Sequence, residues 1–146
     1  MRTLALAVLI AGLALAGCAA AALPGVVFEA TGAPLSSAAA EKLAASTDIS
    51  AFRSVESSAA PALRAAALRE LRAKGEPGVR AAELLTTGFP AVTTSVPVLV
   101  RMCAVDGVDA IVVVEAYGDA GGKLTHRRLW VFGRTSGAVL RAASFL

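Results

Sequence analysis

Few side chains in this sequence could carry out acid–base, nucleophilic or metal chemistry. The chain has one histidine, His126, and two cysteines, Cys18 and Cys103. It contains no HExxH, CxxC or phosphate-binding glycine motif. Glu115 is the one acid inside the strands predicted below, apart from Asp109 at the start of the same strand. These observations predict a protein without a catalytic site, a metal or a cofactor.

Cys103 and His126 would be the two members of a nucleophilic pair, if there were one. The strand order predicted below places them two strands apart, about 9–10 Å, which is beyond hydrogen-bond distance. Cys103 lies in the apolar run Val98–Val105. We therefore interpret it as a buried small hydrophobic residue, with a reactive thiol as the alternative.

Cys18 ends a segment that has the internal order of a targeting signal. Arg2 is followed by an apolar run over residues 4–15, and residues 3–28 carry no charge. The closing tetrad resembles the lipobox of bacterial lipoproteins at all four positions: Leu15-Ala16-Gly17-Cys18. Because the uncharged stretch is long enough to span a bilayer, a retained transmembrane helix is one alternative, and an ordinary secretory peptide is another.

The lipobox resemblance implies a defined modification. The Cys18 thiol takes a diacylglycerol, a signal peptidase cuts between Gly17 and Cys18, and the new amine is acylated, with fatty acids such as palmitate. Each buried methylene contributes about 0.8 kcal/mol, so two or three chains hold a protein on a membrane. Ala19 rather than Asp follows the cysteine, which by resemblance to the common sorting rule favours the outer membrane, facing the periplasm.

The composition predicts one domain behind this signal. Hydrophobic residues make up 56% of the 146 residues and charged residues 17%, which excludes a disordered chain. The net charge of +3 comes from scattered basic residues, so no nucleic-acid partner is expected. We predict a signal peptide over residues 1–17, the lipidated cysteine with a tether over residues 18–37, and a single domain over residues 38–146.

Three helices are expected before a strand-rich end. Ser36 and Ser37 cap a helix to about Ala45, and Gly75 separates two more at Ala59–Lys74 and Val79–Thr87. The longest helix has an apolar stripe with basic residues placed outside it. The stripe is Leu63, Ala67, Leu68 and Leu71, and the basic residues are Arg64, Arg69, Arg72 and Lys74.

The last third reads as strands separated by glycine-containing turns: Val92–Ala104, Asp109–Tyr117, Leu124–Phe132 and Ala138–Phe145. Loops this short join antiparallel neighbours. The predicted fold is an α+β domain, in which two to three helices pack on one face of a four-stranded antiparallel β-meander. Val26–Phe28 is a further short strand candidate, and Pro97 is expected at an edge or a bulge.

A two-residue turn at Asp106-Gly107 sets the register of the first hairpin. It pairs Cys103 with Ala110, Arg101 with Val112 and Val98 with Glu115. The longer second turn leaves two registers open. One places Glu115 opposite His126 and Val113 opposite Arg128, and the other turns the whole third strand over.

The segment His126-Arg127-Arg128-Leu129-Trp130 is the candidate interaction site. Its two adjacent arginines lie on opposite faces of a strand, and Arg and Trp are favoured at binding hot spots. Arg127, Arg128 and Trp130 could contact a protein or a lipid headgroup. The alternative is that one arginine is solvated, the other lies over the sheet edge, and Trp130 belongs to the core.

The order of lipobox, tether, helix pair and antiparallel sheet resembles the SmpA/OmlA (BamE) family of small outer-membrane lipoproteins. Gly88-Phe89-Pro90 after a helix, and Leu129–Phe132 before Ser136–Val139, are similar to that family's motifs. The resemblance implies an accessory role in outer-membrane assembly or integrity. We therefore expect a non-catalytic envelope binding module with an unknown protein partner; the alternatives are a small-ligand or lipid carrier and, third, an envelope enzyme.

Overall fold

The structure is a computed structural model that describes residues 22–88 and 94–146. Gly17 and Cys18, the end of the helix stop at Phe89-Pro90 and the expected strand start at Val92 lie outside the described residues. The elements are β1 (Val27–Glu29), α1 (Ser37–Ser46), two short 3-10 helices (Ser50–Phe52 and Ser57–Ala59), α2 (Ala60–Arg72), α3 (Glu76–Thr87), β2 (Ser95–Val105), β3 (Val108–Tyr117), β4 (His126–Gly133) and β5 (Val139–Phe145).

The α+β class is confirmed, but within the described residues the sheet has five strands instead of the predicted four and is mixed instead of antiparallel. Its order is β1-β2-β3-β4-β5, with β1 parallel to β2 and the other pairs antiparallel. Val27–Glu29 pair with Leu99–Arg101. The short strand candidate thus occupies the free edge of β2, where its backbone meets unpaired N–H and C=O groups.

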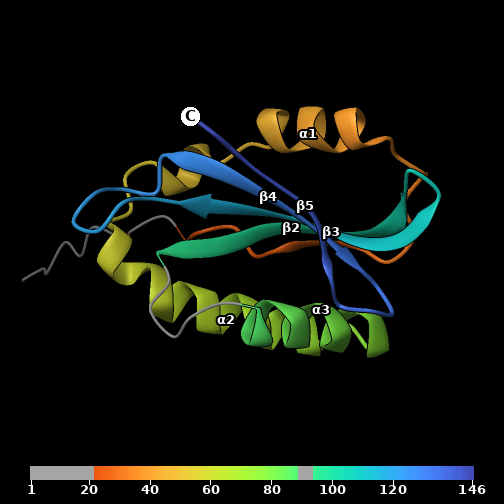
Figure 1. Cartoon of the computed structure of the whole chain (residues 1–146). Coiled ribbons are helices and arrows are strands. Elements are labelled where there is room, and N and C mark those ends of the chain that lie inside the picture. Colours follow the sequence, from red (N-terminus) through yellow and green to blue (C-terminus); the bar gives the residue numbers. More distant parts are fainter. Residues whose placement is uncertain (1–21, 89–93) are drawn as a thin grey trace, which may run out of the picture.

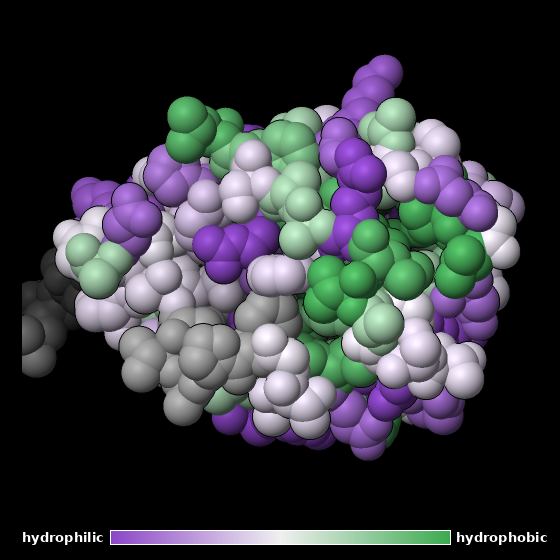
Figure 2. Space-filling model, in the orientation of Figure 1, coloured by the Kyte–Doolittle hydropathy of each residue, from purple (hydrophilic) through white to green (hydrophobic). Residues whose placement is uncertain are grey.

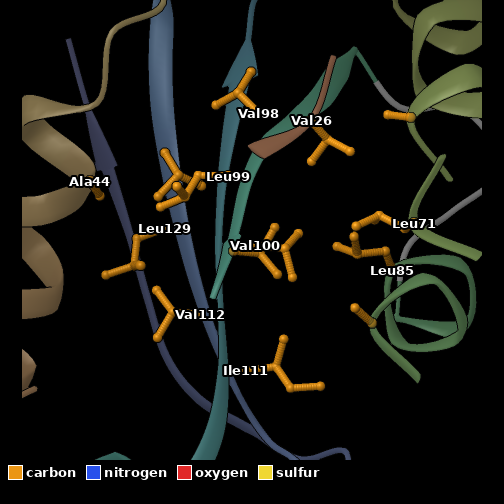
Figure 3. Close-up of a cluster of buried hydrophobic side chains, with 14 of the residues drawn as sticks. Val26, Ala44, Leu71, Leu85, Val98, Leu99, Val100, Ile111, Val112 and Leu129 are labelled. Atoms are coloured by element: carbon orange, nitrogen blue, oxygen red, sulfur yellow. The ribbon is translucent and has the colours of Figure 1, made fainter. Parts of the chain in front are cut away.

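The helices cover both faces of the sheet, so the prediction that they pack on one face was wrong. Figure 1 shows α1 on one side of the strands and α2 with α3 on the other. Side chains of the same strands are buried against both layers. In Figure 3, Leu99, Val112 and Leu129 lie toward Ala44 of α1, and Val100 and Ile111 lie toward Leu71 of α2 and Leu85 of α3. A sheet that is apolar on both faces must be covered on both.

The first hairpin has the predicted register up to a bulge. Cys103 pairs with Ala110 and Arg101 with Val112, as expected. The register shifts between Pro97 and Leu99, so Pro97 instead of Val98 lies opposite Glu115. Proline has no N–H to donate to a ladder, and a bulge is one of the few places where a strand tolerates it.

The open register of the third predicted strand is settled by β4. Glu115 lies opposite Arg128, and Tyr117 lies opposite His126. Both proposed pairs are therefore displaced by two residues from the first alternative. A shift of two residues keeps every side chain on its face of the sheet, so the face assignment of that alternative holds although its pairs do not.

The segment that precedes α1 packs on the domain. Val26 is buried, and its backbone N–H donates to Glu70 of α2 at 3.1 Å. Further along, the N–H of Leu35 donates to the carbonyl of Ala104 at 2.9 Å. This segment therefore closes the β2 edge of the sheet. Among the described residues, no helix is long and apolar enough to cross a membrane.

The start of α1 is tied to the β2–β3 turn. Ser36 caps the helix as predicted, accepting a hydrogen bond from the N–H of Ala39. The carboxylate of Asp106 in the turn accepts hydrogen bonds from the backbone N–H and the hydroxyl of Ser37. These bonds to its charged form lower the pKa of Asp106. The turn thus positions the first turn of α1 as well as joining two strands.

The β2–β3 turn gives a test of the hairpin. Gly107 has a φ of 80°, and a Cβ added there would meet nothing within 4 Å. Gly107→Ala is therefore expected to lower the free energy of unfolding through backbone conformation alone, by about 1–2 kcal/mol. Gly107→Asn should lose less, because Asn tolerates this region better. Urea denaturation followed by Trp130 fluorescence measures both, and equal losses would contradict the argument.

Candidate functional site

An ion pair lies inside the apolar core between the sheet and the α2–α3 layer. Glu115 of β3 is 0% exposed and Arg64 of α2 is 7% exposed. Arg64 Nη1 donates to Glu115 Oε1 at 2.5 Å and to the carbonyl and hydroxyl oxygens of Ser95, while Nη2 donates to the Leu85 carbonyl at 2.9 Å. These additional hydrogen bonds help to offset the cost of removing two charges from water.

Sequence reasoning placed Arg64 outside the apolar stripe of α2, and this placement was wrong. The spacing did contain the signal. Residues 64, 67, 68 and 71 follow the i, i+3, i+4, i+7 pattern of a buried helix face. Arg64 was assigned to the solvent-facing side because arginine is charged, although its position in the helix predicted a buried side chain. Glu115, an acid in an otherwise apolar strand, was the other half of the signal, because a buried carboxylate requires a cation or hydrogen-bond donors.

Trp130 of β4 contacts the second oxygen of the same carboxylate. Its indole Nε1 donates to Glu115 Oε2 at 3.0 Å. The indole also stacks on Phe132, with ring centroids 6.2 Å apart and planes 19° from parallel. Glu115 therefore has a donor on each oxygen, and the Trp130 ring is held in one orientation, partly buried beside the core.

Arg128 lies next to this network and has no acid of its own. It is directly opposite Glu115 on the neighbouring strand, yet no ion pair joins Arg128 to any carboxylate in the described residues. Its guanidinium lies over the Tyr117 ring, 4.0 Å from the centroid, and 5.9 Å from the Trp130 centroid. A cation over aromatic rings is held in place by them, and stacking does not use up the N–H donors at the edge of its planar fork.

His126 completes this group of partly exposed side chains. Its ring centroid is 5.3 Å from that of Tyr117, and its Nδ1 is buried without a hydrogen-bond partner among the described residues. We call Tyr117, His126, Arg128 and Trp130 the Arg128 face. All four lie on the α2–α3 side of the sheet, and all are partly exposed.

The two adjacent arginines have different environments. Arg127 lies on the opposite side of β4, where its Nε donates to the Thr47 carbonyl at the end of α1 at 2.7 Å. It therefore binds α1 to the sheet. Of the three predicted interaction residues, the structure brings Arg128 and Trp130 together and places Arg127 on the other face. Tyr117, at the end of the neighbouring strand β3, is the ring beneath Arg128.

The remaining candidates for chemistry are separated. Cys103 is buried on β2, and burial raises the pKa of its thiol. His126 lies two strands away on β4. Cys103 is opposite Ala110 near the start of β3, whereas His126 is opposite Tyr117 at its end. No group of three or more His, Cys, Asp or Glu side chains in residues 22–88 and 94–146 could hold a metal ion.

A shallow cavity of about 100 Å³ lies between the N-terminal segment, α2 and the start of β2. Its lining is mainly apolar, with Leu23, Val26, Phe52 and Leu63 among the residues, and Glu70 at its side. This volume is below the roughly 300 Å³ at which small-molecule pockets begin. Neither His126 nor Arg128 lines it.

No match to this chain was found among protein-family models, curated proteins or solved structures. Support for a function therefore comes from two features of the chain itself. One is the Arg128 face, and the other is the sequence that ends in Cys18.

The buried ion pair gives a stability prediction. Arg64→Met leaves the Glu115 carboxylate buried without its cation and is expected to lower the free energy of unfolding by about 3–5 kcal/mol. The double variant Arg64→Met with Glu115→Gln should recover most of that loss, since no buried charge remains and Gln can still accept from Trp130. Urea denaturation at neutral pH measures both variants.

Arg69→Met is the matched control, because Arg69 is exposed on the same helix; it should change stability by less than about 0.5 kcal/mol. A double variant as unstable as Arg64→Met alone would show that the uncompensated charge is not the cause of the loss.

Proposed function

We propose that this protein is a lipid-anchored, periplasm-facing binding module of the bacterial cell envelope, without a catalytic role, which docks a partner protein on the Arg128 face. The binding role is inferred from the environment of Arg128. It is a partly buried cation fixed over Tyr117, and it has no acidic partner in the described residues.

A partner carboxylate is the group that fits this arginine. The guanidinium offers donors in a planar fork that matches a carboxylate in two-point contact. Trp130 and Tyr117 add aromatic surface beside it, and Trp, Tyr and Arg are the residue types that dominate binding hot spots. The rigid support from the Glu115–Trp130 hydrogen bond reduces the ordering cost of binding. The expected contact is an acidic side chain flanked by apolar ones.

The anchoring part of the proposal is supported by Leu15-Ala16-Gly17-Cys18. The resemblance to the SmpA/OmlA family gives this role a context, namely outer-membrane assembly or integrity. Leu23 and Val26 pack on the domain, so the described fold reaches within five residues of the proposed anchor at Cys18.

The two alternative functions have less support. A carrier of a lipid or small ligand would need a larger cavity than the one of about 100 Å³ beside α2. An enzyme would be favoured by a cavity that holds His126 near Glu115 or Arg128. Neither His126 nor Arg128 lines the described cavity. The two carboxylate oxygens of Glu115 already accept hydrogen bonds, one from Arg64 and one from Trp130.

The anchor can be tested by replacing Cys18. In cells of a lipoprotein-processing bacterium, the full chain is expected in the membrane fraction and to stay there after a high-salt wash. Cys18→Ser should remove this retention, and mass spectrometry of the mature N-terminus should show acyl groups on the parent chain only. Undiminished membrane binding by Cys18→Ser would contradict lipid anchoring.

The binding face can be tested in intact envelopes. His126 is replaced by a photoreactive phenylalanine analogue, so that illumination captures a partner seated beside Arg128. Adding Arg128→Ala is expected to reduce the yield of the adduct about tenfold, equivalent to 1.4 kcal/mol. Arg128→Lys should give an intermediate yield, because the charge remains without the fork.

Arg72→Ala is the control, since Arg72 is exposed in the last turn of α2 and is not part of the Arg128 face. An adduct that survives Arg128→Ala, or one that consists of lipid instead of protein, would overturn the proposed docking role.

A further inference from the structure

The sheet has one edge without a strand beside it in the described residues. β1 and the Leu35 segment cover the edge of β2, whereas β5 pairs with β4 alone. The outward backbone N–H and C=O groups of an edge strand form a ready template for another strand. Many proteins protect such edges with a charge, and β5 has only one charged residue, Arg141.

Exposed hydrophobic residues are concentrated at this edge. Of the six large hydrophobic residues exposed in the described part of the chain, three lie on β5 or directly after it: Val139 at 53%, Leu140 at 47% and Leu146 at 93%. In Figure 2, hydrophobic side chains interrupt the polar surface in the region that β5 crosses in Figure 1. Clustered apolar side chains on an open edge indicate a surface that is covered by another chain.

The charge of β5 is already neutralised within the chain. Arg141 forms an ion pair with Glu41 of α1. An incoming strand therefore meets no uncompensated charge on β5 itself, and two copies of β5 would not repel one another. The residues that follow Arg141 are small, Ala142, Ala143 and Ser144, so that they allow close approach. These features favour an identical strand over a charged segment of another protein.

We propose that two copies of this chain associate by antiparallel pairing of their β5 edges about Ala143. The regular part of β5, after the irregularity opposite Val131 and Phe132, begins at Arg141 and has Ala143 at its centre. In this register Ala143 faces its own copy and Ala142 faces Ser144. The two most exposed leucines then cover each other, since Leu140 of one copy lies opposite Leu146 of the second.

The pairing is closed by a twofold axis, so that no further edge is left for a third copy. The axis is perpendicular to the sheet, and the two Arg128 faces lie on the same side of one continuous ten-stranded sheet. Three strand spacings separate the two β4 strands, about 14 Å. The dimer therefore leaves the Arg128 face open, and this inference does not depend on the role proposed for that face.

Cysteine cross-linking of the full chain in intact cells, with an added membrane-permeable thiol oxidant, tests the register in whichever compartment the chain lies. Directly opposite residues in an antiparallel pair are about 4.5–5.5 Å apart at Cα, a separation that a disulfide can bridge. Ala143→Cys is expected to give a band of twice the mass on a non-reducing gel, at least tenfold stronger than in the parent chain. Cys103 is buried and should add little background, and Cys18 is present in the parent chain and in every variant, so it cannot account for a difference between them.

Val108→Cys is the control, because Val108 is an exposed strand residue that lies at the β2–β3 turn and not on β5. Since Ala143 also packs against the core, the variant with both Ala142→Cys and Ser144→Cys, at two exposed positions, serves if Ala143→Cys fails to accumulate. It should link each Cys to the opposite one in the second copy. Adding Leu140→Lys to either variant should reduce the dimer at least fivefold.

The proposal is overturned if the β5 cysteines give no more dimer than Val108→Cys, if the product is a mixed disulfide with another protein, or if Leu140→Lys leaves the dimer yield unchanged.

Discussion

The ion pair between Arg64 and Glu115 determines how the α2–α3 layer sits on the sheet and what lies outside it. Arg64 connects α2 to β3, β2 and α3 through one guanidinium. Both oxygens of Glu115 are occupied, by Arg64 and by Trp130. For that reason Arg128, which lies opposite Glu115 on the neighbouring strand, forms no ion pair within residues 22–88 and 94–146 and lies over Tyr117 instead. A buried interaction thus leaves a cation available at the surface.

The same arrangement explains why this surface has a fixed shape. The Trp130 ring is oriented by a hydrogen bond to a carboxylate that cannot move, since Arg64 holds it. The Arg128 face is therefore supported by buried residues, through the hydrogen bond from Trp130 to Glu115. Side chains held in this way lose little freedom when a partner binds.

The local part of the fold could be predicted from the sequence, because local signals determine it. Serine capping at Ser36, the stop at Gly75 and the turn at Asp106-Gly107 depend on residues close to one another in the chain. The placement of α1 on the second face and the parallel pairing of β1 depend on contacts between distant segments. The bulge after Pro97 is one of the two outcomes that the proline itself predicts. Apolar residues on both faces of the β2–β3 hairpin indicate that each face is covered, but they do not indicate which helix or strand covers it.

The candidate site was predicted in part for the same reason. Alternation along a strand was enough to separate Arg127 from Arg128, but the partners of each arginine come from other elements, Thr47 from the end of α1 and Tyr117 from β3. The buried role of Arg64 could have been inferred from its helical spacing together with the lone acid on the sheet. The hydrogen bond from Trp130 to Glu115 required the register of β4, which the second turn left open.

If Cys18 carries a lipid, as we propose, the attachment of the N-terminal segment to α2 and β2 limits how far the domain can lie from it. Four residues, Ala19–Ala22, separate that cysteine from Leu23, which packs against the core. Five residue steps span at most about 18 Å when fully extended. An anchored domain would therefore search for partners by lateral diffusion in the plane of the bilayer, and the density of partners per membrane area, instead of their concentration in the periplasmic volume, would set how often they meet.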